Sequence, residues 1–186
     1  WFDDLGISIQ ERPAHTHALV FNAVFPGRQA GCAFERFTQH GPLAVLPLPS
    51  THRHEQRYNV VWSVSETEVD ALIDLSDEQF RGRLQEAFGW RLGAVGAVGR
   101  GSQWPLVRSL ASEQWRAGFL LVGNAAHTLH PVAGQGLNLS LREADLLAKT
   151  LIAAVTSGQP LSRISSLRGY LTQVAAEQQF LASSTD

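Results

Sequence analysis

The stretch that decides how the last third of this chain folds is Gly118-Phe-Leu-Leu-Val-Gly-Asn-Ala-Ala-His-Thr-Leu-His-Pro-Val-Ala-Gly-Gln-Gly-Leu-Asn138. Its apolar beginning, residues 118–122, predicts a strand, and the small residues that follow predict a loop. The amphipathic segment after it predicts a helix over residues 137–155. The loop brings Gly134 and Gly136 to the start of that helix, where exposed N–H groups and the helix dipole attract anionic or polar groups. The pattern predicts either a ligand site at this junction or a tight connection without a ligand.

The bulk composition is that of a folded protein. The 186 residues are 44% hydrophobic and 17% charged, which allows a packed core in one domain or one and a half. The net charge of -2, without a basic tract, gives no electrostatic support for nucleic-acid binding. The single cysteine, Cys32, excludes an internal disulfide and a cysteine-based metal cluster, and it fits a reducing compartment. No apolar run reaches the ~20 residues of a membrane helix, and no signal peptide is recognised.

Hydrophobic periodicity predicts the remaining elements. Strands are expected at 18–25, 32–39, 43–48 and 57–64, followed by a helix that Ser76 caps and Gly89 ends. One or two strands are expected within 95–107, where Pro105 ends the regular part, and 109–115 is expected to be a loop or a short helix. A last helix is expected from residue 161 onward. The fold class is therefore α+β, mainly an antiparallel sheet with helices.

The chain divides, on this interpretation, into residues 1–116 and residues 117–186. The nearly uniform apolar character of 118–122 is typical of a strand buried on both faces of a parallel sheet, yet no other strand here looks like its parallel neighbour. The chain also contains no Met, which predicts a piece of a larger protein. An uncovered edge at 118–122 leads us to expect a homodimer, domain swapping or a rearranged C-terminal third.

Several residues together resemble a known flavin motif: Gly123-Asn-Ala-Ala-His127, Pro131, Gly134-Gln-Gly-Leu-Asn138 and Arg142. They resemble the second flavin-binding motif of the class A flavoprotein aromatic hydroxylases. The segments 34–47, 76–80, 87–93 and 129–131 resemble the ubiquinone-biosynthesis hydroxylases, in particular the 2-octaprenyl-6-methoxyphenol hydroxylase branch. Asn124 stands where the wider family has Asp, and that branch accepts Asn. Ser140 and Glu143 stand where the family has Gly and Asp.

The resemblance implies a fold and a cofactor site. The fold is an antiparallel-sheet substrate domain of the p-hydroxybenzoate-hydroxylase type, here 1–116, joined to the last strand and C-terminal helices of an FAD-binding Rossmann-type domain, here 117–186. The site residues carried over to this chain are Gly123, Asn124, Pro131, Gly134, Gln135, Gly136, Leu137 and Asn138. Asn124 is expected to hydrogen-bond the ribityl chain of FAD, and the helix start is expected to lie beside the pyrimidine edge of the flavin.

The resemblance also implies an activity and partners. The whole enzyme would use FAD, NAD(P)H and O2 to hydroxylate a polyprenylated phenol in the cytoplasm, with other ubiquinone-pathway proteins as partners and peripheral contact with the inner membrane. No basic amphipathic helix in the chain supports that membrane contact. The family's Gly-x-Gly-x-x-Gly motif, which holds the FAD pyrophosphate, is missing here, so the chain alone is expected to bind FAD weakly. A non-catalytic scaffold that binds a partner is the alternative.

Two further groups of residues have competing interpretations. His127 and His130 are spaced like metal ligands, but no third ligand is near in sequence, so a metal site is not expected. Aromatic and aliphatic residues on the predicted hairpin favour sheet core over a phenol pocket: Phe34, Phe37, Leu43, Val45 and Leu48. Because Phe34 and Phe37 are an odd number of residues apart, they should point to opposite faces of the sheet.

Overall fold

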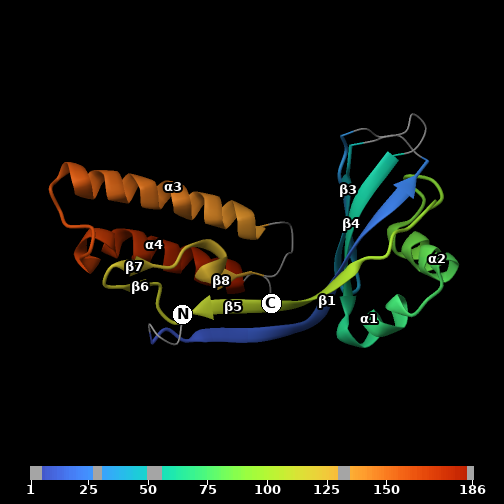
Figure 1. The fold of residues 1–186 in the computed structure, drawn as a ribbon, viewed down its shortest axis with the longest axis horizontal. Helices are drawn as coiled ribbons and strands as arrows, with labels where there is room; N and C mark the ends of the chain where they lie inside the picture. The colour runs from blue at the N-terminus through green and yellow to red at the C-terminus, as the bar shows by residue number, and fades with distance from the viewer. Residues whose placement is uncertain (1–5, 27–30, 50–55, 130–134, 184–186) are drawn as a thin grey trace. The chain divides into compact units, whose positions relative to one another are not determined.

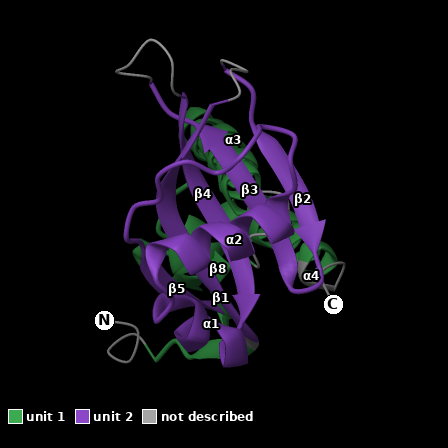
Figure 2. Ribbon diagram, turned by 90° about the vertical axis from the view of Figure 1, so that its right-hand side faces the viewer, with its two compact units in different colours: residues 1–14, 107–186 green, residues 15–106 purple. Residues whose placement is uncertain are grey.

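The computed structural model describes residues 6–26, 31–49, 56–129 and 135–183. The chain forms two compact units, shown in Figure 2. Unit 1 contains residues 1–14 and 107–186, and unit 2 contains residues 15–106. The units do not follow the order of the chain, because two long strands each begin in one unit and end in the other. The boundary expected after residue 116 stays a prediction.

Strands come first along the chain and long helices last, as the colours of Figure 1 show. The elements are β1 (Ile9–Phe25), β2 (Phe34–Thr38), β3 (Gly41–Pro47), β4 (Gln56–Ser65), α1 (Glu66–Ile73), α2 (Asp77–Phe88), β5 (Ser102–Ala111), β6 (Trp115–Arg116), β7 (Phe119–Leu120), the 3-10 helix η2 (Gly123–Ala125), β8 (His127–Thr128), α3 (Gln135–Thr156) and α4 (Ile164–Ser183). The α+β class and the predicted hairpin of β2 and β3 are confirmed.

Unit 2 is an antiparallel sheet with two helices against one face. Its strands lie in the order β2-β3-β4-β1. Phe34 pairs with Val45, Val45 with Val60, and Val60 with Phe21, so alternate residues of all four strands share one face. Figure 2 shows α1 and α2 in front of these strands.

Aromatic contacts join α2 to the sheet of unit 2. The ring of Phe80 lies 5.0 Å from that of Phe21, and the ring of Phe88 lies 5.6 Å from that of Phe25. Leu84, between them on the helix, is fully buried. The helix begins at the predicted capping box, in which the Ser76 side chain accepts from the Gln79 N–H and the Gln79 side chain accepts from the Ser76 N–H.

Two strands extend beyond their predicted bounds. β1 begins at Ile9, nine residues before the expected start, because its first half is polar and exposed and gives no alternating signal. β5 covers Ser102–Ala111 and continues through Pro105, so the prediction of a break there, and of a loop or helix from residue 109, was wrong. Pro105 is tolerated because β8 pairs only with Ser109 and Leu110, which leaves one side of β5 without a strand neighbour at residue 105 among the described residues.

The predicted strand at 118–122 is shorter and pairs differently. β7 contains only Phe119–Leu120 and lies antiparallel to β6 in a two-stranded hairpin. Gly118 adopts a φ of 80° in the turn between them, a conformation that glycine enters without steric penalty. The interpretation of this segment as a doubly buried parallel strand was therefore wrong for the described part of the chain, since both residues of β7 are only half-buried.

Unit 1 is dominated by the helices α3 and α4, which contact each other and lie side by side in Figure 1. Both helices were predicted, α3 within two residues at each end. Not every apolar residue of α3 is buried, since Ile152 is 66% exposed. α3 carries apolar residues on two faces, and the buried face is the one with Leu139, Glu143 and Ala154. No described helix is both long and apolar enough to cross a bilayer.

The packing of unit 2 predicts opposite effects for two glycine substitutions. Gly82→Ala in α2 should raise the free energy of unfolding by about 0.5–1 kcal/mol, because its Cβ meets nothing within 4 Å and alanine restricts the unfolded chain. Gly101→Ala should lower it by about 1–3 kcal/mol, because its Cβ would lie 2.3 Å from the carbonyl oxygen of Val20. Urea unfolding measures both, and equal effects at the two positions would contradict this packing.

Candidate functional site

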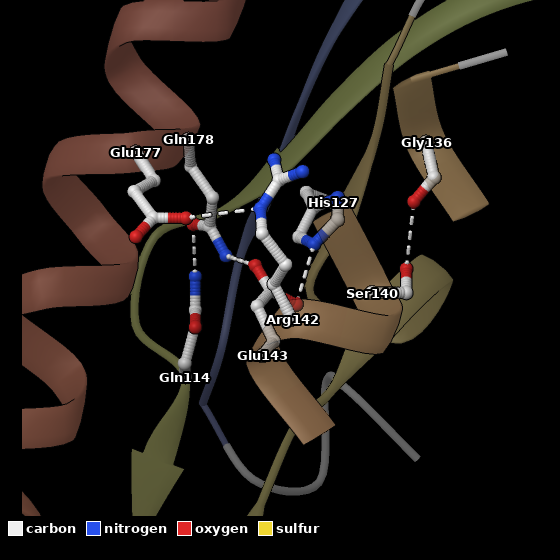
Figure 3. A network of polar contacts seen from close by, with 8 residues as sticks. All are labelled: Gln114, His127, Gly136, Ser140, Arg142, Glu143, Glu177 and Gln178. Carbon is white, nitrogen blue, oxygen red and sulfur yellow. Dashed lines mark hydrogen bonds and ion pairs between the residues drawn. The ribbon is translucent and has the colours of Figure 1, made fainter. Parts of the chain in front are cut away.

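The loop after β7 lies against the first turns of α3. Gly123 begins the 3-10 helix η2 with a φ of 60°, and a Cβ built on it would lie 3.4 Å from Ser140 Oγ. A larger residue would be strained by that backbone conformation, while its Cβ would meet Ser140 at ordinary contact distance. Ser140 in turn donates from Oγ to the carbonyl oxygen of Gly136 at 3.0 Å (Figure 3). The structure therefore brings Gly123 close to the start of the helix.

The predicted site residues fall in two short segments. Gly123 and Asn124 lie on η2, and Asn124 is exposed. Gln135, Gly136, Leu137 and Asn138 form the first turn of α3, where Leu137 and Asn138 are exposed. Pro131 and Gly134 lie outside the described residues, so their positions remain predictions.

The described residues of the junction fit the polar edge of a flavin. The first N–H groups of α3 have no carbonyl partner within the helix, as in any α-helix. A Cβ placed on Gly136 would meet no atom of the described residues within 4 Å, so that part of the backbone has space for a ligand beside it. The amide of Asn124 is accessible and can both donate to and accept from a hydroxyl group.

A buried polar network lies behind this junction, and the sequence did not predict it. His127 Nε2 lies 2.9 Å from Glu143 Oε2, and both side chains are 1% exposed. Gln178 Nε2 donates to Glu143 Oε1 at 2.8 Å, and Gln114 Nε2 donates to Gln178 Oε1 at 2.5 Å. Figure 3 shows these four side chains converging from β8, α3, α4 and the segment before β6. In the sequence Glu143 stands out only as a departure from the family motif, although it follows Leu139 by four residues and so shares its face of the helix.

His127 contacts the carboxylate of Glu143, and His130, the other histidine of that pair, lies outside the described residues. Within the ranges that the structure describes, no group of three or more His, Cys, Asp or Glu side chains is placed to hold a metal ion.

The aromatic and aliphatic residues of the hairpin are mostly core. Leu43 and Val45 are fully buried, and Phe34 packs against Phe88 with its ring 6.3 Å away. Phe37 is 65% exposed, which places it on the other face as predicted. A cavity of about 310 Å³ that the sequence did not indicate lies instead in unit 2. Its apolar lining includes Leu19, Phe21, Leu72, Leu75, Phe80 and Val98.

The charge of Glu143 acts on a neighbouring tyrosine. Burial, and secondly the Glu143 carboxylate, raise the pKa of Tyr170 from 10.0 to about 12. Its hydroxyl is buried and has no hydrogen-bond partner among the described residues. The protonated hydroxyl is therefore favoured in the folded state.

This shift predicts a pH dependence of stability. Because the unfolded tyrosine loses its proton near pH 10 and the folded one near pH 12, the contribution of Tyr170 is fully present below pH 10 and is lost as the pH rises toward 12. Tyr170→Phe should show a smaller fall in melting temperature than the unmutated protein over this range. Circular dichroism measures both melting temperatures. An identical fall in melting temperature in the two proteins would contradict the raised pKa of Tyr170.

Comparisons with known proteins identify the family of this chain. The model of the FAD binding domain family matches residues 3–168. The chain is 36% identical to ubiquinone hydroxylase UbiL of Rhodospirillum rubrum over 156 residues, covering 84% of this chain and 35% of that protein. It is 33% identical to 3-demethoxyubiquinol 3-hydroxylase of Escherichia coli over 153 residues, covering 82% of this chain and 38% of that protein.

Solved structures agree on the fold. A mutant of PqsL from P. aeruginosa superposes with a TM-score of 0.69 at 24% identity, over 98% of this chain and 49% of that one. The chain spans little more than a third of the length of the two curated relatives, at 35% and 38%. From the match over residues 3–168, the chain belongs to the FAD binding domain family.

Proposed function

We propose that this chain forms the flavin-ring side of the FAD site, and part of the substrate site, of a monooxygenase. That enzyme would use NAD(P)H and O2 to hydroxylate a polyprenylated phenol in ubiquinone biosynthesis. The proposal rests on the start of α3, where the backbone at Gly136 has free space beside it and Gly123 of η2 lies nearby. The chain that carries this junction belongs to the FAD binding domain family. The similarity to two ubiquinone hydroxylases supports the substrate class.

The residues of unit 1 would bind and orient the cofactor. The N–H groups of the first turn of α3, with the positive end of the helix dipole, would stabilise negative charge on the pyrimidine edge of the flavin. Asn124 would hydrogen-bond the ribityl chain, and Pro131 and Gly134 would complete the loop. When bound, FAD would supply the oxygen chemistry, and the protein would supply position and electrostatic field.

The residues of unit 2 would bind the substrate. One face of its sheet is covered by α1 and α2, and alternate residues point to the other face. That face carries apolar side chains such as the exposed Phe37 and Leu46, and also the half-buried Arg57. Apolar area suits a prenyl chain, and the polar groups suit the phenol ring. In this proposal unit 2 supplies the substrate side and unit 1 the flavin side.

The test uses the full-length protein. We expect it to purify with FAD, recognised by flavin absorbance, and to hydroxylate a polyprenylated phenol with NADH or NADPH in the presence of O2. Gly136→Ala should weaken FAD binding by about tenfold, which corresponds to about 1.4 kcal/mol, because its methyl group would occupy the open space at the helix start. Gly169→Ala in α4 is the matched control, since its Cβ also meets nothing within 4 Å but lies away from the site.

The urea concentration at the midpoint of unfolding should be the same in Gly136→Ala and Gly169→Ala as in the unmutated protein, or slightly higher. Absence of flavin from the full-length protein, or equal FAD affinity in the two glycine variants, would contradict the proposal.

A further inference from the structure

Glu143 is a carboxylate held almost entirely away from water. Its side chain is 1% exposed and lies on the buried face of α3 with Leu139 and Ala154. Burial of an unpaired carboxylate is strongly unfavourable, so such a group persists only where donors replace its hydration. Each oxygen of Glu143 has one donor, Gln178 Nε2 at 2.8 Å and His127 Nε2 at 2.9 Å.

The direction of the hydrogen bonds in this network follows from its chemistry. A carboxylate only accepts, so His127 must carry a hydrogen on Nε2. The amide of Gln178 gives its N–H to Glu143 and uses its oxygen to accept from Gln114. The amide orientations thus agree along the chain of contacts in Figure 3, and every donor is directed toward the carboxylate. Glu143 is the acceptor on which the network ends.

The network joins the two segments of the candidate flavin site. His127 lies three residues after Asn124, on the strand that directly follows η2. Glu143 lies on α3, two turns after the helix start at Gln135. Gln178 and Gln114 fix the same carboxylate to α4 and to the segment before β6. A change at Glu143 would therefore alter the position of the loop relative to the helix start.

We propose that Glu143 is a positioning residue of the flavin site, which acts through His127 to hold the loop of Gly123 and Asn124 beside the first turn of α3. The inference rests on the proposed function, because the ligand that it positions the loop for is FAD. It adds a role for a residue that touches neither the exposed loop nor the open helix start.

The substitution Glu143→Gln separates charge from shape. Glutamine fills the same volume, but its amide presents one acceptor and one donor where the carboxylate presented two acceptors. Gln178 still needs an acceptor, so the new N–H2 group faces His127 Nε2. His127 must then accept at Nε2 and move its hydrogen to Nδ1, which inverts the tautomer.

The experiment measures FAD affinity and the His127 tautomer in the full-length protein. In Glu143→Gln we expect the Kd for FAD to rise about tenfold or more, because hydrogen bonds to charged groups are among the strong ones. Glu177→Gln is the matched control, since Glu177 lies on the more exposed side of α4, where it pairs with Arg142 at 3.7 Å and accepts from Gln173 Nε2 at 3.4 Å. The Kd of this control for FAD should change less than about twofold. Nitrogen-15 shifts of His127 should show hydrogen on Nε2 in the unmutated protein and on Nδ1 in Glu143→Gln.

The possible outcomes are distinct. Full-length protein that binds no FAD would overturn the proposed function. Unmutated protein that binds FAD, while Glu143→Gln binds it equally well, would overturn only the positioning role. Absence of hydrogen on Nε2 of His127 in the unmutated protein would overturn the network itself.

A second variant covers the case in which Glu143→Gln does not fold. His127→Gln places an amide N–H near the position of Nε2 and should keep the Kd for FAD within a few-fold, whereas His127→Leu should raise it about tenfold. Equal affinity of these two histidine variants would overturn the positioning role.

Discussion

A single buried carboxylate organises the helical unit of this protein. Glu143 has one hydrogen-bond donor on each oxygen, and these donors come from β8 and α4. Because an unpaired charge in the interior is strongly unfavourable, the burial of the Glu143 carboxylate depends on its contacts with His127 and Gln178. The charge also reaches Tyr170, whose pKa is raised mainly by burial and secondly by Glu143. The buried face of α3 thus contains the hydrogen-bonded Glu143 as well as the apolar Leu139 and Ala154.

The exposed side of the junction between η2 and α3 differs from the buried polar network behind it. Gly123 has a φ of 60° and lies at ordinary contact distance from Ser140, whereas a Cβ on Gly136 would meet no described atom within 4 Å. The loop therefore packs against the helix, and the described part of the helix start leaves space for a ligand. This asymmetry supports the proposed flavin site, because a bound ring needs a fixed backbone and an approachable row of N–H groups. Unit 2 would add the substrate face through a sheet whose other face is filled by α1 and α2.

Sequence patterns predicted the elements whose periodicity is strong and local. The helix α3, the hairpin of β2 and β3, and the capping box at Ser76 follow from spacing and from the chemistry of single residues. The pairing of β7 could not be predicted, because a short apolar run looks alike in a parallel sheet and in a half-buried hairpin. Glu143 was noticed only as a departure from a family motif. A charged residue on an amphipathic helix normally faces water, and only the three-dimensional positions of His127 and Gln178 show that this one does not.

We propose that FAD binds at the junction of η2 and α3, with the buried network behind it. Hydrogen exchange of the full-length protein, measured by mass spectrometry with and without FAD, detects binding at this junction. We expect slower exchange on FAD binding at residues 123–129 and in the first turn of α3, with no change in α2. FAD binding that leaves exchange at 123–129 and at residues 135–138 unchanged would contradict it.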